Sequence, residues 1–325
     1  MKILVTDPNL VPHRARFEAA VPPQCELRWL VGAEPDVVLE ELRDTEVYVG
    51  GRFTAAMASA AEKLRLIHIV GAGTDRIDFA ALPAHVSVAN TFHHERSIAE
   101  YVVAATVMLR RHFPVQDREL RRGVWATSVY NPAIPQAMSL QDAKIGFVGF
   151  GHIGQRSWDL LRVFGAVGAA VTGSGRLDAA THGLLWSADV GELERLMSES
   201  DVVVVSAPLT PATENMIGAA ELRALGPDGV LVNVGRGPLV DERALYDALV
   251  ERQIRAAAID VWYRYPGPDG RGTPSDLPFG ELSNILMTPH SSGVTSNTFI
   301  GRLEDVAANI DRLLRGEAVH NLVNR

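Results

Sequence analysis

The sequence predicts an α/β protein of two domains, each built on a doubly wound parallel sheet. Short apolar runs that end in Gly, Asp, Asn or Pro alternate with helical stretches along the chain, and this alternation is typical of parallel sheets. The runs fall into two series, which predicts two separate sheets. At 325 residues the chain is long enough to bury two cores.

The first series of strand-like runs lies in the N-terminal part of the chain, and the second lies beyond a long helical pattern. The first comprises Ile3–Thr6, Leu27–Val31, Val47–Gly50, Leu66–Val70 and Val86–Ala89. The second comprises Ile145–Val148, Ala169–Thr172, Val202–Ser206, Val230–Val234, Ala256–Asp260 and Ile285–Thr288. Because the first run starts at the N-terminus, that end of the chain is typical of a strand rather than of a signal peptide.

Between the two series, residues 97–113 have a helical pattern. Ser97 and Glu100 have the spacing of a capping box, so we expect the helix to begin at Ser97. Residues 114–140, which contain Trp125 and Tyr130, predict an irregular segment that packs as an arm or interface rather than as a linker.

A second long helix is predicted over Thr295–Arg315, ending at Gly316. The tail that follows, Val319–Val323, is expected to return to the first sheet. The first domain would then be discontinuous, formed by residues 1–96 and 293–325, and the second would comprise residues 97–292.

Composition limits the possible partners. The formal net charge is −8, which opposes binding to nucleic acid or to an anionic membrane. No apolar run reaches the roughly 18–20 residues of a membrane span. The one cysteine, Cys25, cannot form an internal disulfide or a thiolate metal cluster. We therefore expect a soluble cytoplasmic protein with a small-molecule ligand.

A glycine-rich turn lies between the first strand of the second series and a helical pattern. Gly149, Gly151 and Gly154 have G-x-G-x-x-G spacing. In this context the first glycine permits a tight turn, the second lets the backbone approach a pyrophosphate, and the third lets helix and strand pack closely. The sequence therefore predicts a dinucleotide site at this turn, with His152 and Ile153 at the helix start. The alternative is a turn that binds no ligand.

The next strand helps to predict which dinucleotide binds. An acidic residue at its end would bind a free ribose 2′-hydroxyl, but this stretch has no acid before Asp178. Ser174 and Arg176 are suited to a 2′-phosphate instead. NADP is therefore favoured over NAD, and the alternative is that Arg176 is only a solvated loop residue.

Six motifs along the chain, three of them at the ends of the last strands, resemble those of the D-2-hydroxyacid dehydrogenase family, which includes glyoxylate/hydroxypyruvate reductases, phosphite dehydrogenases and formate dehydrogenases. They are Val70–Asp75, Ile98–Glu100, Ser206–Thr213, Asn233–Leu245, Ala258–Trp262 and Met287–Gly293. The resemblance covers nearly the whole chain. It implies a Rossmann dinucleotide-binding domain, a flavodoxin-like substrate domain, a cleft between them that holds the active site, and a homodimer formed through the second domain and the arm.

Two residues in these motifs suit the reduction of a 2-keto acid. Arg236 carries a planar fork of donors that binds a carboxylate bidentately. His290 titrates near neutrality and can give or take the proton. The alternatives are a structural ion pair for Arg236 and a structural role for His290, and the motif positions favour the functional interpretation of both.

The resemblance implies roles for further residues. The backbone N–H groups of Ala72 and Gly73 would hold the carboxylate, and Asp260 would lie near the nicotinamide amide. The residues expected to line the cofactor cleft are Ala207, Pro208, Thr213, Val234, Gly235 and Gly293.

The chain departs from the family pattern at two places. Tyr265 stands where most members have a glutamate that pairs with the histidine; a phenol can orient His290 but cannot hold an imidazolium by charge. In the loop 91–96, His94 falls where an asparagine is usual, and we expect it to face the substrate. There are two alternatives for this loop. It could be merely solvated, or it could form a metal site with His93, His94 and Glu95, although adjacent histidines seldom share an ion without a further ligand.

Three functions follow from these residues. The first is an NAD(P)-dependent reductase of a small 2-keto acid such as glyoxylate or hydroxypyruvate, with Arg236, His290 and Tyr265 at the reaction centre. The second is oxidation of a one-centre anion such as formate or phosphite, because Tyr265 replaces the glutamate. The third is a dinucleotide sensor without turnover, which retention of both Arg236 and His290 disfavours.

Overall fold

The computed structural model describes residues 1–267 and 269–323, and the chain divides into two compact units. Unit 1 contains Met1–His94 and the chain from Val294 onward, and unit 2 contains Glu95–Gly293. Each unit is an α/β fold around its own parallel sheet, which confirms the predicted fold class. Within the described part of the chain, no helix combines the length and apolar character that crossing a bilayer requires.

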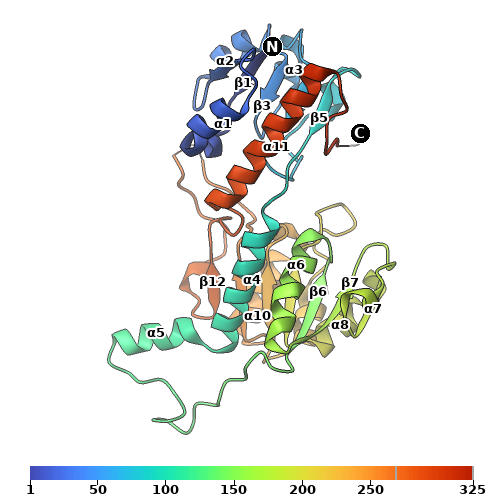
Figure 1. The fold of residues 1–325 in the computed structure, drawn as a ribbon. Helices are drawn as coiled ribbons and strands as arrows, with labels where there is room; N and C mark the ends of the chain where they lie inside the picture. Colours follow the sequence, from blue (N-terminus) through green and yellow to red (C-terminus); the bar gives the residue numbers. More distant parts are fainter. Residues whose placement is uncertain (268, 324–325) are drawn as a thin grey trace. The chain divides into compact units, whose positions relative to one another are not determined.

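Unit 1 is built on a five-stranded parallel sheet of order β2-β1-β3-β4-β5 (Figure 1). This is the strand order of flavodoxin-like folds. The strands are β1 (Lys2–Val5), β2 (Glu26–Trp29), β3 (Val47–Val49), β4 (Leu66–His68) and β5 (Ser87–Ala89). The helices are α1 (Arg14–Ala20), α2 (Pro35–Leu42), α3 (Ala55–Ala60) and α11 (Ser296–Arg315).

The alternation of side chains along β1 shows how unit 1 buries both faces of its sheet. Ile3 and Val5 point to the side covered by α1 and α11 and share a core with Leu303. Leu4 points to the opposite side and packs with Leu42 of α2. Successive strand residues face opposite sides of a sheet. A strand that is buried on both faces therefore has an uninterrupted apolar sequence.

The predicted limits of the C-terminal helix are confirmed. Thr295 caps the N-terminus of α11 by accepting a hydrogen bond from the Thr298 backbone, and Gly316 ends the helix with φ +69°. The tail then returns to the first sheet, as predicted, because Leu322 forms an antiparallel bridge with Ala89. Unit 1 is therefore assembled from both ends of the chain (Figure 1).

Unit 2 is built on a seven-stranded parallel sheet of order β12-β11-β10-β9-β6-β7-β8. The strands are β6 (Lys144–Val148), β7 (Val167–Val171), β8 (Trp186–Ala188), β9 (Val202–Val205), β10 (Val230–Asn233), β11 (Ala256–Ile259) and β12 (Ile285–Met287). The order reverses between β6 and β9. In such sheets ligands bind beyond the carboxyl ends of the strands at the reversal, which is the Rossmann arrangement.

Helices cover both faces of this second sheet. They are α4 (Glu95–Arg110), α6 (His152–Leu161), α7 (Ala179–His182), α8 (Leu193–Glu199), α9 (Ala219–Leu225) and α10 (Glu242–Val250). The helix α5 (Phe113–Arg121) follows α4 and has no buried residue. On one face, Phe147 of β6 packs with Val102 of α4 and Trp158 of α6. On the other, Val148 shares a core with Leu196 of α8 and residues of α9 and α10.

The predicted start of α4 is wrong. The helix begins at Glu95 rather than at Ser97, so Ser97 lies in the first turn and not at the N-cap. The preceding loop is already fixed, because Arg302 donates to the Phe92 carbonyl over 2.9 Å. The carboxylate of Glu95 then lies in the first turn, where the helix dipole favours an anion.

Two further elements differ from the sequence prediction. Residues 113–121 form α5 instead of an irregular segment, because His112 turns the chain at φ +58° and Pro114 suits the first turn of a new helix. The strand β8 was not predicted; it is a three-residue edge strand that pairs only with β7, and its half-buried residues give a weak apolar signal.

A buried histidine ties the sheet of unit 1 to its C-terminal helix. His68 has no exposed surface, and burial lowers its pKa to about 4. Asn309 donates from Nδ2 to His68 Nε2 over 2.9 Å and also bonds both backbone polar groups of His320. His68 is therefore held in its neutral form.

This burial predicts a loss of stability in acid. The folded pKa of His68 is below the unfolded value of about 6.5, so the unfolded state binds more protons as the pH falls below 6.5. Between pH 7.5 and pH 5 we expect His68 to remove about 2 kcal/mol of unfolding free energy. Urea denaturation of the wild type and of His68→Gln at both pH values measures this effect, and an equal pH dependence in the two proteins would contradict it.

Candidate functional site

The glycine-rich turn connects β6 to α6 at the strand reversal. Gly149 has φ +86°, and a Cβ placed there would lie 2.6 Å from the Ala207 backbone nitrogen. A Cβ on Gly154 would lie 2.8 Å from the Gly149 carbonyl oxygen. These two glycines are required by the fold itself, one for a left-handed turn and the other for close packing of helix on strand.

Gly151 differs from its two neighbours. It is the N-cap of α6, with φ −80°, and a Cβ placed on it would meet no atom within 4 Å. The fold therefore does not require glycine there, whereas a ligand approaching the backbone would. His152 and Ile153 open a helix of ten residues, whose first N–H groups can bind phosphate oxygens. The turn thus fits a dinucleotide pyrophosphate.

The chain after β7 carries no carboxylate before Asp178. Ser174 and Arg176 are exposed, and Ser174 Oγ accepts a hydrogen bond from the Arg176 backbone over 3.3 Å. Asp178 caps α7, accepting from the Ala180 backbone and from the Thr181 hydroxyl, and these bonds hold the pKa of its carboxyl below the usual value. Asp178 is therefore engaged with its own helix.

The loop after β9 lies beside the glycine turn, because Ala207 limits the space at Gly149. Thr213 closes this loop: its hydroxyl donates to the Pro208 carbonyl over 2.8 Å and accepts from the Thr210 backbone over 2.8 Å. Of the residues predicted to line the cofactor cleft, Ala207 is half-buried and Pro208 is exposed.

Arg236 lies in the turn that follows β10. The Asn233 side chain fixes this turn by donating to the Arg236 carbonyl over 3.0 Å and accepting from the Gly235 backbone over 3.1 Å. Val234 is buried, whereas the Arg236 side chain is half-buried, with Nη1 donating to the Gly235 carbonyl over 2.9 Å. The guanidinium is therefore oriented by its own turn at the carboxyl edge of the sheet.

His290 follows β12 and has Tyr265 as its partner. The Tyr265 hydroxyl lies 2.9 Å from His290 Nδ1, and the two rings are 5.6 Å apart at an angle of 51°. A phenol can donate to Nδ1 of the neutral imidazole or accept from the imidazolium. Tyr265 and His290 are therefore hydrogen-bonded in the structure, and the partner of the imidazole is a neutral phenol.

Asp260 lies between these elements, at the end of β11, and is fully buried. Its carboxylate accepts hydrogen bonds from the Thr288 hydroxyl, the Ser291 backbone, and both the backbone and the hydroxyl of Ser292. This role of Asp260 was not predicted from the sequence, although Thr288, Ser291 and Ser292 belong to the same motif as His290. Gly293, the last residue of unit 2, follows directly and is half-buried.

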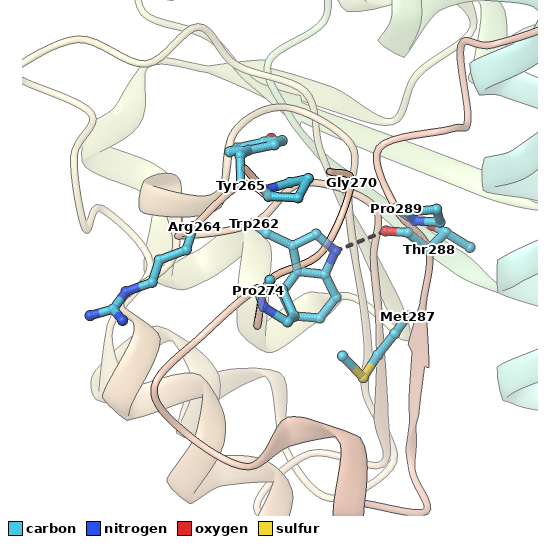
Figure 2. A pocket seen from close by; sticks show the side chains of 10 residues that line it. Trp262, Arg264, Tyr265, Gly270, Pro274, Met287, Thr288 and Pro289 are labelled. Carbon is cyan, nitrogen blue, oxygen red and sulfur yellow. Dashed lines mark hydrogen bonds between the residues drawn. The ribbon is translucent and has the colours of Figure 1, made fainter. Parts of the chain in front are cut away.

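A pocket of about 280 Å³ adjoins Tyr265 (Figure 2). Its walls are mostly apolar and include Trp262, Met287 and Pro289. Arg264 extends away from the pocket and pairs with Asp276 (Figure 2). The charge of Arg264 is therefore balanced by a carboxylate.

Unit 1 holds the remaining predicted residues. Asn90 donates to the Ala72 carbonyl over 2.9 Å, which shapes the loop that contains Ala72 and Gly73. His94 stacks on Phe92 at 24°. His93 Nε2 lies 2.9 Å from an Asp305 carboxylate oxygen. Across residues 1–267 and 269–323, no group of three or more His, Cys, Asp and Glu side chains is arranged to hold a metal ion.

Comparison with known proteins identifies relatives of the whole chain. Residues 103–292 match the family model described as the D-isomer specific 2-hydroxyacid dehydrogenase, NAD binding domain. A D-3-phosphoglycerate dehydrogenase of Methanocaldococcus jannaschii is 31% identical, over 100% of this chain and 59% of the relative. The chain thus spans about three fifths of the length of this curated relative.

Solved structures show the same fold. A D-isomer specific 2-hydroxyacid dehydrogenase from Lactobacillus delbrueckii ssp. bulgaricus, complexed with NAD, has a TM-score of 0.83 at 21% identity and full coverage of both chains. An NAD-dependent formate dehydrogenase from Staphylococcus aureus, in complex with NAD, has a TM-score of 0.77 at 27% identity, covering 100% of this chain and 99% of the other.

The geometry of the glycine turn predicts two different effects of alanine. Gly151→Ala adds a methyl group where the protein leaves space, so we expect an unchanged melting temperature and a loss of dinucleotide affinity of about tenfold or more. Gly149→Ala is the matched control, and its positive φ and backbone clash predict lower stability. Thermal unfolding and fluorescence titration with NADH and NADPH measure both. Unchanged affinity in a folded Gly151→Ala would contradict a pyrophosphate at this turn.

Proposed function

The chain belongs to the D-isomer specific 2-hydroxyacid dehydrogenase family, and from this we propose that it interconverts a small 2-keto acid and the 2-hydroxy acid with a nicotinamide dinucleotide. The substrate we propose is glyoxylate- or hydroxypyruvate-like. The observation that carries the proposal is the position of Arg236 and His290 after β10 and β12, at the same sheet edge as the glycine turn.

The proposed chemistry divides among these groups. When bound, the nicotinamide would supply or accept the hydride. Arg236 binds the substrate carboxylate through its planar fork and polarises the keto oxygen. His290 gives the proton to that oxygen during reduction and takes it back during oxidation. Tyr265 holds the imidazole through Nδ1, which leaves Nε2 for the substrate.

We also propose substrate-binding roles for residues of unit 1. We assign the backbone N–H groups of Ala72 and Gly73 to the carboxylate and His94 to the substrate face. Residues 1–96 and 293–325 would form this substrate domain, and residues 97–292 the dinucleotide-binding domain. Asp260 and Gly293 would border the nicotinamide, with Asp260 acting mainly through the loop that it holds.

Tyr265 supports a second candidate, oxidation of a one-centre anion such as formate. A formate C–H carries no hydroxyl proton, so hydride removal from it needs no imidazolium held by a carboxylate. The 27% identity to the Staphylococcus aureus formate dehydrogenase adds to this candidate. Because other relatives are D-3-phosphoglycerate dehydrogenases, an assay panel should include 3-phosphoglycerate beside formate, glyoxylate and hydroxypyruvate.

We also propose that the cofactor is NADP and that the protein is a homodimer. The absence of a free carboxylate after β7, together with exposed Arg176, supports the 2′-phosphorylated cofactor. The arm that follows α5 exposes Trp125, Val129 and Tyr130 by 60% or more, and a second copy covering such apolar side chains would stabilise the assembly.

The neutral partner of His290 predicts a shift of the pH–rate profile. In Tyr265→Glu a carboxylate would stabilise the imidazolium, so the alkaline limb of kcat/KM for reduction should move up by about one pH unit or more. Tyr265→Phe, which removes only the hydroxyl, serves as the uncharged control, and its limb should stay close to that of the wild type. Superimposable profiles for wild type and Tyr265→Glu would contradict the pairing.

His290→Ala should abolish turnover, and retained turnover would remove His290 from the proposed chemistry.

Cofactor choice is tested at Arg176. We expect Arg176→Ala to raise KM for NADPH by about tenfold or more, because one charge-assisted contact is lost, and to leave KM for NADH within about twofold. Arg176→Lys keeps the charge and should retain part of the preference. Steady-state rates with both cofactors measure this, and a wild type that prefers NADH would overturn the assignment.

A further inference from the structure

His290 has a backbone conformation that its side chain does not favour. Its φ is +55°, in the left-handed region. A histidine in this region loses stability relative to ordinary conformations, so surrounding contacts must hold it there. The next two residues provide those contacts, because the backbone N–H groups of Ser291 and Ser292 both donate to Asp260, over 2.9 and 3.1 Å.

Asp260 can hold this loop only if its carboxylate is itself fixed. The Thr288 hydroxyl lies 2.6 Å from Oδ1, the oxygen that also accepts from Ser291. Thr288 is anchored a second time through its backbone, because the Trp262 indole N–H donates to the Thr288 carbonyl over 2.8 Å (Figure 2). Thr288 therefore connects the end of β12 to the buried carboxylate.

Tyr101 of α4 completes the connection. Its hydroxyl lies 3.0 Å from Thr288 Oγ1. Burial and the nearby Asp260 charge raise the pKa of Tyr101 to about 12, so the phenol keeps its proton throughout the working range. The Thr288 hydroxyl is placed to donate to the Tyr101 oxygen as well as to Asp260, so the three side chains form one hydrogen-bonded group.

We propose that Tyr101 and Thr288 are positioning residues for His290. They form a relay from Tyr101 through Thr288 to Asp260, which holds the 288–292 loop in the conformation that presents the imidazole. Neither residue touches the reacting atoms in this arrangement, and the proposal rests on the proposed acid/base role of His290. The relay joins the helix α4 to the carboxyl edge of the sheet within unit 2.

Three variants separate the members of the relay. Tyr101→Phe removes one hydroxyl, Thr288→Val removes the hydroxyl at nearly constant shape, and Thr288→Ser keeps the hydroxyl as the conservative control. Because Tyr101 acts through Thr288, the double variant Tyr101→Phe with Thr288→Val should be no slower than Thr288→Val alone. Such non-additivity is the signature of residues that act as one unit.

Kinetics provide the first measurement. For the best 2-keto acid of the panel we expect kcat to fall about tenfold in Thr288→Val and about threefold in Tyr101→Phe, because a misplaced acid/base group slows proton transfer. KM and the dinucleotide Kd should stay within about twofold, and Thr288→Ser should recover most of the wild-type kcat. Additive losses, an equal loss of dinucleotide affinity, or an unchanged kcat would each overturn the proposal.

Hydrogen exchange provides a measurement without turnover. In both single variants, peptides that cover residues 288–293 should exchange faster than in the wild type, while peptides of α6 should not change. Faster exchange with unaltered kcat would show that the relay orders the loop without serving His290, which would overturn the proposal. If the wild type reduces none of the 2-keto acids, the proposed function fails, and the exchange of 288–293 alone then decides whether the relay holds this loop.

Discussion

The buried carboxylate of Asp260 is the interaction on which the candidate site most depends. A carboxylate with no exposed surface must have its hydrogen-bonding capacity satisfied inside the protein. The donors found for the Asp260 carboxylate lie in the 288–292 loop. The charge thus selects one loop conformation among many. Leaving such a group without its donors typically costs about 1–3 kcal/mol or more, so these hydrogen bonds hold the loop that carries His290 against the end of β11.

Sequence patterns predicted the parts of the fold that arise from local rules. Strands buried on both faces read as continuous apolar runs, and Thr295 and Gly316 mark the ends of α11 as expected. One failure occurred where a distant contact decides: the loop before α4 is fixed by Arg302, from the far end of the chain, so the capping signal at Ser97 was misleading. The pairing of Tyr265 with His290 was predictable from motif positions, but the hold of Asp260 on Ser291 and Ser292 was not, because it depends on backbone geometry.

The glycine turn shows why three similar residues have different importance. Gly149 and Gly154 are excluded from substitution by the protein's own backbone, whether or not a ligand binds. At Gly151 a Cβ would lie within 4 Å of no atom in the described part of the chain. A glycine there suits a group that approaches the backbone from solvent, and the positive end of α6 favours a negatively charged group.

Tyr265 changes how the proposed proton transfer is controlled. A glutamate partner would favour the imidazolium at every stage, whereas a phenol leaves the protonation of His290 to the remaining charges near it. Under the proposed function, an anionic substrate bound at Arg236 brings its own carboxylate to the site. That charge arrives with the substrate and leaves with the product, whereas a glutamate partner would be a permanent charge. Without a permanent charge beside it, the imidazole of His290 must be held in place by geometry. The ordered 288–292 loop then does the work that a glutamate would share in most family members.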